Sequence, residues 1–66
     1  MESIRITWAA ARVNANLTQD DTAKAMNVSK NTVVAWEKYK SEPSVSQAKK
    51  LSEIYGIPLD MIDTVG

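Results

Sequence analysis

Residues 17–37 have the sequence LTQDDTAKAMNVSKNTVVAWE, and this stretch decides the fold. Thr18 followed three residues later by Asp21 is typical of a capped helix start. The hydroxyl and the carboxylate can each accept an N–H group that the first turn leaves unpaired. Asn27 suits a left-handed turn, and Ser29 can cap a second helix directly after it. The stretch therefore predicts two short helices joined by a tight turn.

The spacing of the apolar residues indicates which faces of these helices are buried. We expect the first helix over about residues 19–26 and the second over about residues 30–39. In the second helix Val33 and Trp36 lie three positions apart, so both should face the core. This leaves four residues on the open side of its first turns: Lys30, Asn31, Thr32 and Ala35. Such a layout is typical of a DNA-reading helix-turn-helix, whose second helix enters the major groove.

The remaining chain also predicts helices. An apolar stripe favours a helix over residues 4–14. Ser44 and Gln47 form a capping-box pair for a fourth helix, which Gly56 should end. A last short helix is expected to start near Pro58. We find no segment with a β-strand pattern, so the sequence predicts an all-α, compact bundle of five short helices.

Length and composition limit the class of protein. Residues 1–66 suffice for a single domain with one small core, and a single core in a chain this short rarely supplies more than about 3–5 kcal/mol of stability. The chain has no cysteine and no histidine, so it has no ordinary metal site. It also lacks a phosphate-cradling glycine loop. We therefore expect no enzyme activity and no cofactor.

Hydropathy and charge indicate where the protein is expected in the cell and what it can bind. No apolar run approaches the roughly 20 residues needed to span a bilayer, and no signal peptide is recognisable, so we expect a cytoplasmic protein with no membrane contact. Eight basic and eight acidic residues give a net charge of zero. This argues against nucleic acid, because attraction to phosphates supplies most non-specific affinity. Lys30, Lys38 and Lys40, however, flank the second helix of the motif and favour a basic face there.

Several motifs together resemble a known family, the Cro/CI-type (XRE-like) helix-turn-helix regulators with a lambda-repressor-like DNA-binding domain. The chain looks most similar to short regulators of temperate phages from Gram-positive bacteria. The resemblance covers residues 6–62. It rests on the order and spacing of six pieces: Ala10 to Asn14, Leu17 to Gln19, Val28-Ser29 with Thr32-Val33, Trp36-Glu37, Pro43-Ser44 and Tyr55 to Asp60.

The resemblance implies three sets of functional residues. The residues expected to read bases are Lys30, Asn31, Thr32 and Ala35. Those expected to contact DNA phosphates are Gln19, Lys38 and Lys40. A structural ion pair is expected between Arg12 and Glu37. Asn31 is the sharpest candidate, because asparagine can pair bidentately with adenine, whereas Ala35 can only touch a thymine methyl group.

The chain departs from the family after the second helix of the motif. Lys38 and Tyr39 stand where the family frequently has a basic residue followed by glycine. The shape of the following loop is therefore not predicted by the resemblance.

The sequence thus predicts a sequence-specific double-stranded DNA-binding transcriptional regulator, a phage or prophage repressor or Cro-like protein. Because one small module contacts few bases, we expect a homodimer, at least on DNA, and a roughly palindromic operator. Two alternatives stay open. One is a protein-interaction module that uses the same fold without binding DNA. The other is the N-terminal DNA-binding part of a longer repressor.

Overall fold

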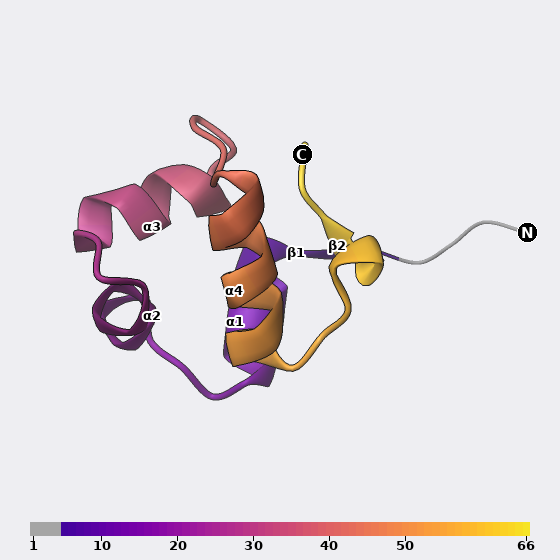
Figure 1. The fold of residues 1–66 in the computed structure, drawn as a ribbon, viewed down its shortest axis with the longest axis horizontal. Coiled ribbons are helices and arrows are strands. Elements are labelled where there is room, and N and C mark those ends of the chain that lie inside the picture. Colours follow the sequence, from indigo (N-terminus) through magenta and orange to yellow (C-terminus); the bar gives the residue numbers. More distant parts are fainter. Residues whose placement is uncertain (1–4) are drawn as a thin grey trace, which may run out of the picture.

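The computed structural model describes residues 5–66, and helices form most of this part of the chain (Figure 1). The elements follow in the order β1 (Ile6–Thr7), α1 (Trp8–Asn14), α2 (Gln19–Met26), α3 (Lys30–Glu37), α4 (Val45–Tyr55), the 3-10 helix η1 (Leu59–Met61) and β2 (Ile62–Asp63). α2 and α3 lie at one end of the longest axis, and η1 lies towards the other end. No helix within residues 5–66 has the length and hydropathy of a membrane span.

The first helix begins later than the sequence predicts. Residue 4 lies outside the described residues, and α1 begins only at Trp8, where Thr7 Oγ1 accepts the N–H of Ala10 at 3.1 Å. Ile6 and Thr7 instead form β1, which pairs in parallel with β2 and places Ile6 opposite Ile62. The prediction that no β structure is present was wrong. Two-residue strands that pair across the length of the chain leave no local periodicity to detect.

Residues 5–66 contain four α-helices, so the prediction of five was wrong. The last predicted helix is the single turn η1, because only three residues separate Pro58 from β2. The predicted end of the second motif helix at Tyr39 also needs correction. α3 ends at Glu37, since Tyr39 has a left-handed backbone with a φ of 59°.

Each of these four α-helices is followed, within two residues of its end, by a residue with positive φ. These residues are Asn16, Asn27, Tyr39 and Gly56. At each end, the next backbone N–H donates to the carbonyl five residues earlier: Leu17 to Arg12, Val28 to Ala23, Lys40 to Ala35 and Ile57 to Ser52, at 2.9–3.2 Å. This Schellman arrangement pairs carbonyls that would otherwise be left over. Asparagine and glycine tolerate the geometry, whereas it costs a residue such as Tyr39 about 1–2 kcal/mol.

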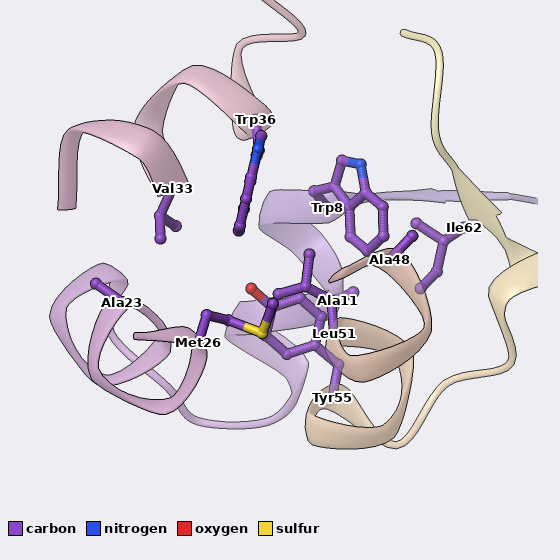
Figure 2. Packing of buried hydrophobic residues seen from close by; sticks show 10 residues of the cluster. All are labelled: Trp8, Ala11, Ala23, Met26, Val33, Trp36, Ala48, Leu51, Tyr55 and Ile62. Atoms are coloured by element: carbon purple, nitrogen blue, oxygen red, sulfur yellow. The ribbon is translucent and has the colours of Figure 1, made fainter. Parts of the chain in front are cut away.

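The core lies where the four α-helices meet the strand pair (Figure 2). Val33 and Trp36 point into it from α3, which confirms the predicted inner face of that helix. Trp8 of α1 packs edge-on against the ring of Tyr55, with 6.4 Å between ring centroids. The buried apolar residues are Trp8, Ala11, Ala23, Met26, Val33, Trp36, Ala48, Leu51, Tyr55 and Ile62.

One polar side chain is fully buried in this core. Thr22 of α2 has no exposed surface, and its Oγ1 accepts a hydrogen bond from the Tyr55 hydroxyl at 3.4 Å. Burial raises the pKa of Tyr55, which keeps the hydroxyl neutral and able to donate. The pair joins α2 to α4, so the inner side of the helix-turn-helix is bound to the rest of the core by a hydrogen bond as well as by apolar packing.

Candidate nucleic-acid interface

Local hydrogen bonds set the start of α2. Thr18 Oγ1 accepts the N–H of Asp21 at 3.0 Å, and the Asp21 carboxylate accepts the N–H of Thr18 at 2.9 Å, which completes the predicted capping box. The hydrogen bond from the backbone of Thr18 lowers the pKa of Asp21, so the carboxylate stays charged at neutral pH. Asn27 then ends α2 in a left-handed turn, and the chain enters α3 two residues later.

The first turn of α3 presents two exposed side chains. Ser29 Oγ accepts the N–H of Thr32 at 3.3 Å, and the hydroxyls of these two residues lie 3.0 Å apart. Thr32 is half-buried, and its hydroxyl already has a partner within the turn. Lys30 and Asn31 between them are exposed. Of the predicted base-reading residues, these two have the greatest reach from the protein surface.

The outer face of α3 continues beyond its first turn. Asn31 and Ala35 lie four residues apart and therefore share one face of the helix, away from buried Val33 and Trp36. Ala35 is half-buried and offers only its methyl group. The outer face of α3 is thus narrow. It carries the polar side chain of Asn31 near the N-terminus of the helix and the small apolar side chain of Ala35 one turn later.

Tyr39 holds the C-terminal end of α3. Its hydroxyl accepts the N–H of Trp8 at 3.4 Å and donates to the carbonyl oxygen of Asp63. One side chain thereby connects the end of α3 to the start of α1 and to β2. Lys38 and Lys40, on either side of Tyr39, are exposed. The loop keeps the left-handed geometry typical of glycine, although tyrosine occupies the position.

A mostly buried ion pair joins α1 to the end of α3. Arg12 Nε donates to Glu37 Oε2 at 2.6 Å, with side-chain exposures of 15% for Arg12 and 8% for Glu37. The hydrogen bond to Glu37 raises the pKa of Arg12. Arg12 Nη1 also donates to the carbonyl oxygen of Leu17 at 2.8 Å, which holds the loop between α1 and α2.

The same carboxylate orients Gln19, the first residue of α2. Gln19 Nε2 donates to Glu37 Oε1 at 3.0 Å. A carboxylate only accepts hydrogen bonds, so the amide nitrogen of Gln19 must face it. One N–H and the amide oxygen are left for another partner. The phosphate contact predicted for Gln19 thus depends on a side chain whose orientation Glu37 already sets.

The predicted contact residues lie near both ends of α3. The Lys30 ammonium lies 3.9 Å from the Asp20 carboxylate, which brings the first turns of α2 and α3 together. Lys38 and Lys40 lie at the other end of α3, roughly 12 Å away for a helix of eight residues. The structure therefore places Lys30 at one end of α3 and the other two lysines at its opposite end, where Gln19 bonds to Glu37, the last residue of the helix.

Two residues of this region, Tyr39 and Asp20, are not among those predicted from the sequence. The role of Tyr39 could not be predicted from the sequence, because a left-handed backbone is not expected of tyrosine. Asp20 could have been identified from the sequence, because it is a second acidic residue beside Asp21 and the capping box uses only Asp21.

Comparisons with known proteins point to one family. A profile of the family described as helix-turn-helix matches residues 9–62. The chain is 43% identical over 47 residues to an uncharacterized HTH-type transcriptional regulator of Methanocaldococcus jannaschii, covering 71% of each chain. It is 38% identical over 48 residues to the cryptic phage CTXphi transcriptional repressor RstR of Vibrio cholerae, covering 73% of this chain and 43% of the repressor. No solved structure shows significant similarity to the chain.

Proposed function

Because the chain belongs to the helix-turn-helix family and is a DNA-binding transcriptional regulator, we propose that it is a sequence-specific phage or prophage repressor or Cro-like protein. The observation that best supports this is the arrangement of α3, whose inner face is buried at Val33 and Trp36 while Lys30 and Asn31 project from its first turn. In a helix-turn-helix, the corresponding turn reads base edges in the major groove.

Each predicted residue has a distinct task in this proposal. Asn31 pairs with adenine, Lys30 donates to guanine, and Ala35 contacts a thymine methyl group. Thr32 contacts a base or a phosphate through its hydroxyl. Phosphates are contacted by Gln19, Lys38 and Lys40, which position α3 without reading sequence. The buried pair of Arg12 and Glu37 has a structural task only.

A homodimer on a roughly palindromic operator completes the proposal. One eight-residue helix contacts few bases, so two copies are needed for high specificity. The two α3 helices should bind half-sites about one turn of DNA apart, roughly 34–36 Å. Action on DNA implies a cytoplasmic location. The phage source in Gram-positive bacteria stays a prediction, since the phage relative described above comes from Vibrio cholerae.

We expect Asn31→Ala to relax base preference at one position in each half-site. The exposed amide would be lost, and with it a bidentate contact worth about 1–3 kcal/mol of discrimination. Selection of binding sites from random DNA, carried out with the parent and the variant, measures this. An identical preferred sequence for both proteins would show that Asn31 does not read a base.

Lys38→Ala and Lys40→Ala should instead weaken binding to all sequences about equally. Each removes one cation from the phosphate contacts, so the slope of log K against log salt should flatten by about one unit. Gln19→Ala should weaken binding without changing that slope, because the amide is uncharged. Titrations at several salt concentrations measure both effects. A changed base preference in any of these variants would contradict its assignment to phosphates.

A protein-interaction module is the alternative favoured by the zero net charge. Retention on mixed-sequence DNA separates the two functions. A DNA-binding regulator should be retained at low salt and elute with a steep salt dependence. A protein that passes through unretained at low salt, and selects no sequence from random DNA, would support the interaction module instead.

A further inference from the structure

Asp20 places a negative charge beside the surface proposed to bind DNA. It is the second residue of α2, directly after Gln19. The capping box is complete without it, since Thr18 and Asp21 supply both hydrogen bonds. Its side chain is 66% exposed, and its carboxylate lies 3.9 Å from the ammonium of Lys30. The capping box therefore does not require this charge, which also lies in the first turn of α2, where the helix dipole favours an acidic residue.

Lys30 is the residue that this charge affects most directly. Its side chain is 54% exposed and leaves the first turn of α3, where base contacts are expected. A lysine ammonium is a point charge on a flexible stem, so it can bind a phosphate of any sequence as readily as a base. An acidic neighbour from α2 offsets part of its charge and restricts where the ammonium lies.

We propose that Asp20 is a specificity-determining residue, which holds the Lys30 ammonium over the base edges and lowers binding to DNA of unrelated sequence. This inference rests on the proposed function. On unrelated DNA, Lys30 must leave Asp20 to bind a phosphate, and the Asp20 carboxylate then faces phosphates without a counter-charge. On the operator, Lys30 donates to a base with one of its three N–H groups while others stay directed at Asp20. Asp20 thus disfavours the complex with unrelated DNA more than the complex with the operator.

The test compares Asp20→Asn with the parent on two duplexes: the operator found by selection and a scrambled version of it. On the scrambled duplex, the freed Lys30 should add one phosphate contact, so the salt slope should steepen by about one unit. Between 50 and 200 mM salt, a slope that is steeper by one unit lowers the binding constant by a further factor of about four. Operator affinity at matched salt should change by less than about twofold, so the ratio of the two affinities should fall several-fold.

Two further variants test whether the affinity ratio changes because Asp20 acts on Lys30. Asp60→Asn removes the same charge from the first turn of η1, towards the opposite end of the molecule, and should leave the affinity ratio unchanged (Figure 1). In a Lys30→Ala background, Asp20→Asn should no longer lower the ratio, because no ammonium is left to hold.

The outcomes separate this inference from the proposed function. A parent protein that binds no DNA would overturn both. Sequence-specific binding by the parent, with an affinity ratio that Asp20→Asn does not change, would overturn the role of Asp20 alone. A ratio that falls equally with and without Lys30 would also overturn it, since Asp20 would then act on DNA directly. Thermal melts confirm that each variant is folded; the pair is exposed, so little stability depends on it.

Discussion

Glu37→Ala is expected to leave the protein largely unfolded near body temperature. Glu37 is only 8% exposed, and its carboxylate holds both Arg12 and Gln19. Without it, the Arg12 guanidinium stays mostly buried with no counter-charge, and removing one partner of such a pair typically costs about 3–5 kcal/mol. That is comparable with all the stability that the core of a domain this small supplies, which rarely exceeds about 3–5 kcal/mol. Thermal unfolding followed by circular dichroism measures the loss.

The same experiment includes matched variants. Arg12→Ala should have a similar effect, and replacing both residues with well-packed apolar side chains should restore much of the loss. Asp20→Ala breaks the exposed pair with Lys30, which is worth about 0–1 kcal/mol, so this variant should melt close to the parent. If Glu37→Ala and Arg12→Ala also melted within a few degrees of the parent, the buried pair would not stabilise the fold.

Leu51→Ala should cause the second large loss of stability. Leu51 lies at the centre of α4 with 1% of its surface exposed, so the substitution leaves a cavity that the surrounding helices fill only in part. Such changes cost about 2–5 kcal/mol. Urea unfolding should show a lower midpoint with an unchanged slope.

Val45 at the start of the same helix provides the control. It is 74% exposed, and Val45→Ala should change stability by no more than about 0.5 kcal/mol. Equal losses for Leu51→Ala and Val45→Ala would contradict the packing of α4 described above.

The starts of α2, α3 and α4 could be predicted because each depends on residues close together in the chain. The capping box of Thr18 and Asp21 and that of Ser44 and Gln47 are both present as the sequence predicts. Gly56 likewise ends α4 in a left-handed turn. Local hydrogen bonds of this kind are visible in sequence because the partners are three residues apart.

Long-range contacts could not be predicted in the same way. The pair of Arg12 and Glu37 spans 25 positions and was expected only from the family resemblance. Neither the bond from Gln19 to Glu37 nor the pairing of β1 with β2 leaves a periodic pattern. Tyr39 shows the same limit: its backbone adopts a conformation unusual for its residue type, and its hydroxyl is bonded to backbone groups distant in sequence.

The strand pair has a consequence for the order of folding events. Ile6 and Ile62 become neighbours only after the chain between them has closed into a loop, which carries an entropic cost that increases with loop length. The helix-turn-helix, whose contacts are local, should therefore form early and the strand pair late. Tyr39 bonds to Trp8, directly after β1, and to Asp63 of β2, so the same late step also secures the end of α3. Weakening this pairing should then accelerate unfolding more than it slows folding.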